Sequence, residues 1–124
     1  MKGENIQDRT KSLALRVIKM GSQFPDDYPI KVLNQQIIRS ATSVGANYRA
    51  ACRSKSRRDF INKLKIVEEE LDETIYWLEL IGESGFFNKE RLAPLKKECT
   101  EILSIIVKSV MTARKNQRMT SSIK

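Results

Sequence analysis

Between positions 60 and 81, side chains suited to a core recur in unbroken steps of four and three residues. Such steps place side chains on one stripe of an α-helix, whereas one face of a β-strand needs a period of two. The pattern therefore predicts a helix of about 27 residues, roughly 40 Å long, with one face that other helices must cover. The stripe consists of Phe60, Leu64, Val67, Leu71, Thr74, Leu78 and Ile81.

Three other segments show the same helical periodicity. The first stripe is Ile6, Thr10, Leu13, Val17 and Met20. The second is Ile30, Leu33 or Asn34, Ile37, Ala41, Val44, Tyr48 and Ala51. The last is Leu92, Leu95, Cys99, Ile102, Ile106, Ser109 or Val110, and Ala113. Four stripes joined by three short connections, with no strand pattern, predict an all-α, up-down-up-down antiparallel four-helix bundle.

Capping residues indicate where these helices begin. Asn5 and Asn88 are suited to N-caps, Pro29 suits a first turn, and Ser56 forms a capping box with Asp59. The apolar pattern stops after the last stripe, so we expect a basic, flexible tail at 116–124. The expected helices span residues 5–21, 29–53, 57–83 and 89–115, in one domain covering 1–115.

Composition narrows the classes of function. The chain has 124 residues, a formal net charge of +8 and a pI of about 9.7. That charge favours nucleic acid or an anionic membrane surface as partner, although a merely soluble basic protein would share it. Cys52 and Cys99 lie among apolar helical positions, so we expect both to be core residues in a reducing compartment. Since the chain lacks an apolar run typical of a signal peptide or membrane span, we expect a cytoplasmic protein without membrane contact.

An acidic cluster on the long helix raises the question of a metal site. Metal sites in helical bundles take carboxylates from several helices, usually with a Glu-x-x-His motif, whereas these acids lie on one helix and the chain has no histidine. We expect them instead to pair with Arg39, Arg49 or Arg53, with Glu68 and Asp72 partly buried. This predicts a non-enzyme with no metal and no cofactor, and leaves a metal-dependent enzyme as an alternative. The cluster consists of Glu68, Glu69, Asp72 and Glu73.

Cations gather in two segments that an up-down bundle brings to the same end, because the fourth helix runs opposite to the third. Arginine and lysine at one end can contact phosphates in a salt-dependent, weakly sequence-specific manner. The sequence therefore predicts binding of RNA or DNA there, with a solvated charged end as the alternative. The candidates are Arg49, Arg53, Lys55, Arg57, Arg58 and Lys63 in the first segment, and Arg114, Lys115 and Arg118 in the second.

The backs of the second and third helices are not uniformly polar. One offers small residues and an arginine, and the other offers aromatic and acidic residues, so the two surfaces are complementary without being identical. Such surfaces suit a head-to-tail homo-oligomer, which closes into a ring if the rotation allows. The alternative is that they widen the intramolecular core. The candidates are Arg39, Ser43, Ala46 and Ala50 on one helix and Ile66, Glu69, Glu73, Tyr76, Trp77 and Leu80 on the other.

The stretch from Gln35 to Ile81 resembles the bacterial four-helix bundle family named after proteins encoded in 23S rRNA intervening sequences. The matching features are an Arg-Ser-Ala-Thr-Ser stretch from Arg39, Asn47 shortly after it, a Ser/Arg turn before Phe60, and a Glu-rich helix with Trp77. After the serine, many members read Asn-Ile-Ala-Glu-Gly, where this chain has Asn-Tyr-Arg-Ala-Ala.

The resemblance implies a four-helix bundle that is commonly a homopentamer. The family is also similar in fold to the accessory protein of diversity-generating retroelements, a basic pentameric barrel associated with nucleic acid. The ribosomal part of the family name reflects gene location, and the resemblance implies no catalytic residues. A structural or adaptor protein, whose ring docks another protein, is therefore the alternative to a nucleic-acid binder.

Overall fold

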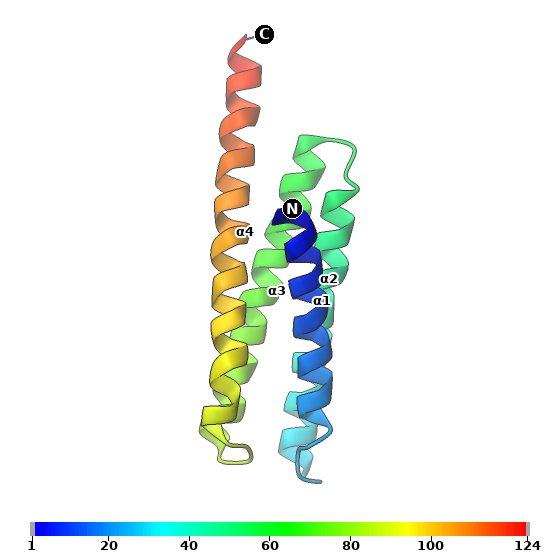
Figure 1. The fold of residues 1–124 in the computed structure, drawn as a ribbon, viewed down its shortest axis with the longest axis vertical. Helices are drawn as coiled ribbons and strands as arrows, with labels where there is room; N and C mark the ends of the chain where they lie inside the picture. The colour runs from blue at the N-terminus through cyan, green and yellow to red at the C-terminus, as the bar shows by residue number, and fades with distance from the viewer. Residues whose placement is uncertain (1, 124) are drawn as a thin grey trace.

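Four antiparallel helices form a bundle with up-down-up-down topology, which confirms the predicted fold class (Figure 1). The computed structural model describes the backbone of residues 2–123 and the side chains of residues 6–117. Helix α2 packs extensively against α3, and α3 against α4, while α1 lies against α2 and touches α4 less. The helices are α1 (Lys2–Gly21), α2 (Tyr28–Cys52), α3 (Arg57–Ser84) and α4 (Lys89–Ile123).

The predicted stripes form the core, with one shift at the start of α3. Every residue of the first stripe is buried, and Leu13 and Val17 are completely so. On α3, Ile61 is buried and Phe60 is only half-buried, so the stripe begins one residue later than predicted. Ser40 is a buried residue that the periodicity did not indicate. Its hydroxyl donates to the Ile37 carbonyl and lies 2.8 Å from Thr74 Oγ1 on α3.

The predicted cap of α3 is confirmed, while the start of α1 and the end of α4 differ from the prediction. Ser56 accepts a hydrogen bond from the Asp59 amide at 3.0 Å, as the capping box predicts. Helix α1 begins at Lys2, so the prediction that Asn5 caps it is wrong. Helix α4 continues to Ile123 instead of ending near 115, because residues 116–123 contain no proline or glycine to break it.

Gly45 lets α1 and α2 approach each other closely. A Cβ at this position would lie 3.4 Å from Thr10 Oγ1, in contact with α1. Gly45 therefore packs within the chain. Ala14 and Ala46 join Gly45 in lining the seam between α1 and α2.

Candidate nucleic-acid interface

The turn from α2 to α3 places five cations at one end of the bundle. Backbone hydrogen bonds from Arg53 N to Ala50 O (3.2 Å) and from Ser54 N to Ala51 O (3.0 Å) close the last turn of α2. The Ser56 cap then starts α3, so the turn is fixed by local hydrogen bonds. The side chains of all five cations are exposed. They are Arg49, Arg53, Lys55, Arg57 and Arg58.

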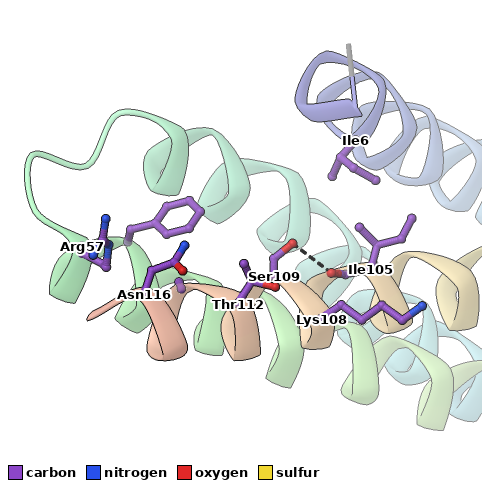
Figure 2. Close-up of a pocket in the computed structure, with 9 residues that line it drawn as sticks. Ile6, Arg57, Ile105, Lys108, Ser109, Thr112 and Asn116 are labelled. Atoms are coloured by element: carbon purple, nitrogen blue, oxygen red, sulfur yellow. Dashed lines mark hydrogen bonds between the residues drawn. The ribbon is translucent and has the colours of Figure 1, made fainter. Parts of the chain in front are cut away.

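Helix α4 returns to this end, as the antiparallel topology requires. A cavity of about 680 Å³ is lined by Arg57 and Phe60 of α3 and by Lys108 and Asn116 of α4 (Figure 2). The segment from Lys108 to Asn116 therefore faces the first turn of α3. Within that segment, the exposed Arg114 and Lys115 lie at the same end as the turn. The two basic segments meet as the sequence predicted, except that the side chain of Arg118 lies outside the described residues.

We call this region the basic end. Few acids offset it, since residues 49–65 contain only Asp59 and residues 102–124 contain none. Asp59 forms an ion pair with Lys63 at 3.0 Å, and this hydrogen bond holds the carboxyl pKa below its usual range. Lys63 is thus partly neutralised and is the weakest of the predicted phosphate contacts. The basic end consists of Arg49, Arg53, Lys55, Arg57, Arg58, Lys108, Arg114 and Lys115.

A second concave surface lies between α1 and α2. It has a volume of about 510 Å³, and we call it the α1/α2 groove. Arg49 and Arg53 line it from α2, and Lys11 and Asp8 line it from α1. Lys11 was not among the predicted contacts, because the sequence does not show how α1 is rotated against α2. The only sequence feature that pointed to Lys11 was its position outside the apolar stripe of the first helix.

The acids of α3 are paired mainly with one arginine. Arg39 on α2 forms ion pairs with Glu73 and with Glu70, the latter at 3.5 Å, and Trp77 Nε1 donates to Glu73 at 3.4 Å. Pairing with Arg39 was therefore predicted correctly. Pairing with Arg49 or Arg53 was not: they line the seam with α1, away from α3.

The remaining acids do not gather into a metal site. Glu68 is half-buried and lies 3.3 Å from Lys65, whereas Asp72 is exposed, contrary to expectation. Asp72 follows the fully buried Leu71 and is therefore rotated about 100° away from it around the helix axis. Among the described residues, no group of three or more His, Cys, Asp or Glu side chains could hold a metal ion.

The two cysteines occupy different environments. Cys99 is buried, and burial, with a smaller effect from Glu98, raises the pKa of its thiol to about 12. Cys52 is exposed, so the prediction that it is a core residue is wrong; it ends α2, where the helix leaves the core. Burial, with Cys52 beside it, also raises the pKa of Tyr48 to about 12, so this phenol adds no negative charge to the basic end at neutral pH.

Arg39 joins the α2 and α3 parts of the proposed oligomer face through its ion pair with Glu73, whereas Ala46 lines the α1/α2 groove. Ile66 and Tyr76 are 39% and 52% exposed, as the helix rotation predicted. Trp77 is half-buried against the core and lies 5.2 Å from the Tyr76 ring, so it partly widens the core, which was the alternative expectation. The other members divide by exposure: Ala46 and Glu69 are exposed, and Ser43, Ala50 and Leu80 are half-buried.

Comparison with known proteins identifies the family. The model of the 23S rRNA-intervening sequence protein family matches residues 4–108. The chain belongs to this family. None of the curated proteins compared with it matches significantly.

A solved structure is also similar to this chain. It is a crystal structure of a protein with unknown function from the S23 ribosomal protein family of Bacteroides thetaiotaomicron. The two chains are 33% identical with a TM-score of 0.82, and the match covers 90% of this chain and 99% of the other. Within the part of this chain that the structure describes, no helix has the length and apolar character needed to cross a membrane.

A bidentate ion pair fastens α1 to α4 below the basic end. Arg9 donates to both Glu98 oxygens, at 2.9 and 2.7 Å, and to Glu101 at 3.0 Å. The side chains of Arg9 and Glu98 are only 22% and 20% exposed. The hydrogen bonds from Arg9 lower the pKa of Glu98 from its ordinary value of 4.5 and raise the pKa of Arg9.

Replacing Glu98 with glutamine is expected to lower the free energy of unfolding by about 1 kcal/mol at pH 7. Because the folded-state pKa of Glu98 is depressed, its contribution is complete above the unfolded value and is lost as pH falls through the folded pKa. Urea denaturation at neutral and at acidic pH measures this. The difference between wild type and Glu98→Gln should disappear at acidic pH, and a constant difference would contradict the assignment.

Proposed function

We propose that this protein is a non-enzymatic binder of the phosphate backbone of RNA or DNA, acting through its basic end. The carrying observation is that α3 and α4 bring two basic segments, distant in sequence, to one end where acids are scarce. Arginine and lysine side chains exposed in this way bind phosphates by releasing condensed counterions. Such contacts position a nucleic acid without reading its bases, so the proposal implies weak sequence preference.

Fluorescence anisotropy with labelled RNA and with labelled DNA tests this proposal. Non-specific binding through phosphates predicts a Kd on the order of 10⁻⁶ M at low salt, with unlabelled nucleic acid of unrelated sequence acting as competitor. No change in anisotropy at low salt with excess protein would overturn the proposal. If only unlabelled nucleic acid of one particular sequence competed, the result would indicate base-specific recognition instead of phosphate binding.

Self-association is a second candidate property, favoured by the exposed apolar residues of the α2/α3 face. Besides Ile66 and Tyr76 on α3, Val32 on α2 is 36% exposed. Exposed apolar side chains of this kind suit a partner surface, and further copies would repeat the phosphate contacts around a ring. A homo-oligomer, or a ring that docks another protein, is the corresponding proposal.

Sedimentation over a range of concentrations tests self-association. A mass above that of the monomer, reduced in Ile66→Glu, is the expected result, and a monomer mass at every concentration would contradict it. Co-purification after nuclease treatment separates the two functions: a protein partner that survives the nuclease supports the adaptor, and one that is lost supports binding through nucleic acid.

A further inference from the structure

The α1/α2 groove differs in character from the larger cavity beside α4. Apolar residues such as Ile6, Phe60 and Ile105 line much of that cavity. Arg57 and Lys108 also line that cavity, but a phosphate placed against its apolar part would lose hydration without gaining hydrogen bonds there. The α1/α2 groove is lined by three cations, and its apolar lining consists of small residues, so it is the hollow at the basic end that better suits an anionic chain.

Three cations line the α1/α2 groove: Lys11 on α1, Arg49 in the last turn of α2, and Arg53 directly after it. Arg49 and Arg53 are separated by about one helical turn, roughly 6 Å along the helix axis. Among the described side chains, none of these three cations forms an ion pair, and all three are exposed. Their charges are therefore available to a ligand rather than to neighbouring carboxylates.

Small side chains keep the groove open beneath these cations. Ala14 of α1 and Gly45 and Ala46 of α2 line it. The Thr42 hydroxyl is turned back onto its own helix, where it donates to the Ile38 carbonyl at 2.7 Å. A ligand entering the groove would contact these cations and, beneath them, small uncharged side chains. Asp8 is the one acid in the described lining and opposes an anion.

We infer that the α1/α2 groove is the site that receives the sugar–phosphate backbone of one nucleic-acid strand, with Lys11, Arg49 and Arg53 contacting its phosphates. This inference rests on the proposed function and adds a location to it. The cations of the α2–α3 turn and of α4 then attract the nucleic acid at longer range, while the groove makes the direct contacts. The strand can come from single-stranded RNA or from one edge of a duplex, which present the same phosphates.

Two triple variants that remove equal charge test the location. The groove triple changes the groove and combines Lys11→Gln, Arg49→Gln and Arg53→Gln. The outer triple changes the same end of the bundle outside the groove and combines Lys55→Gln, Arg58→Gln and Lys115→Gln. For a short labelled single-stranded RNA at low salt, the groove triple is expected to bind at least about 30-fold more weakly than wild type, and the outer triple less than about 5-fold. Urea denaturation of each variant shows whether it is folded.

Two single substitutions test the groove in other ways, one by filling it and one by removing a negative charge. Ala46→Gln places an uncharged side chain in the groove and is expected to weaken binding about 10-fold by excluding the strand, while Ala93→Gln, an exposed position on α4, is its control. Asp8→Asn is expected to strengthen binding about threefold, since it removes the opposing carboxylate. The same variants measured with a duplex show which source of strand enters the groove.

The outcomes separate this inference from the proposed function. Greater loss in the groove triple, together with weakened Ala46→Gln, supports the inference. Equal losses in both triples with unchanged Ala46→Gln overturn the groove and leave the basic end as the binding surface. Unchanged affinity in both triples overturns the proposed function as well.

Discussion

Replacing Arg49, Arg53, Lys55 and Arg58 together with glutamine is expected to lower the affinity for RNA by on the order of 100-fold at low salt. Each of these side chains is exposed at the basic end. Each lost phosphate contact also removes about 0.7 from the slope of log K against log salt for a single strand. The slope should therefore fall by about 3 if all four side chains contact phosphates, and by about 1.4 if only the groove residues Arg49 and Arg53 do. Anisotropy titrations at several salt concentrations measure both quantities.

A matched variant removes the same charge from the opposite end of the bundle. This variant combines Lys19→Gln, Lys31→Gln, Lys89→Gln and Lys97→Gln, all at exposed positions. Among the described side chains, the one ion pair lost with them is that of Lys31 with exposed Asp26 at 2.5 Å. Ion pairs of this exposed kind contribute little to stability. We expect a small loss of affinity and an almost unchanged slope. Equal effects of the two quadruple variants would mean that net charge, and not the basic end, determines binding.

Replacing Leu71 with alanine is expected to lower the free energy of unfolding by about 3–4 kcal/mol, the largest effect on stability that we predict. Leu71 lies in the middle of α3 and is completely buried, so truncation removes apolar contacts and leaves a cavity. Urea denaturation measures the change. A loss below about 1 kcal/mol would show that the core is not packed around this stripe.

Ile66→Ala on the same helix is the control for Leu71→Ala. Its side chain is 39% exposed, so less contact area is lost and a change below about 1 kcal/mol is expected for the monomer. If the α2/α3 face associates with a second copy, the effect of Ile66→Ala will grow with protein concentration. The two substitutions thus separate the role of the core from that of the face.

The fold followed from periodicity because a helical stripe must be covered, and four such stripes with short connections have few alternatives to a bundle. Periodicity determines a face only to within about one residue at helix ends, which explains why Ile61 replaces Phe60 in the core. Ser40 was missed because a hydroxyl gives no apolar signal. Its burial depends on Thr74 facing it across the α2–α3 contact.

The candidate site was predictable in part. Antiparallel topology alone predicts that the α2–α3 turn lies beside the last part of α4. In the structure, residues from the start of α3 and from α4 line one cavity. The contribution of Lys11 could not be predicted, because it depends on how α1 is rotated and how closely Gly45 lets it approach. The partners of Arg49 were likewise misassigned, since its position on α2 fits the seam with α1 as well as the contact with α3.

The salt dependence of RNA binding by the wild-type protein tests the central claim most directly. Contacts to on the order of five phosphates of a single strand predict a slope of log K against log salt of about −3.5, or about a 100-fold loss of affinity between about 50 and 200 mM salt. Anisotropy titrations across that range, with the protein confirmed as folded at each salt concentration, give the slope. An affinity that does not change with salt would contradict phosphate binding through the basic end.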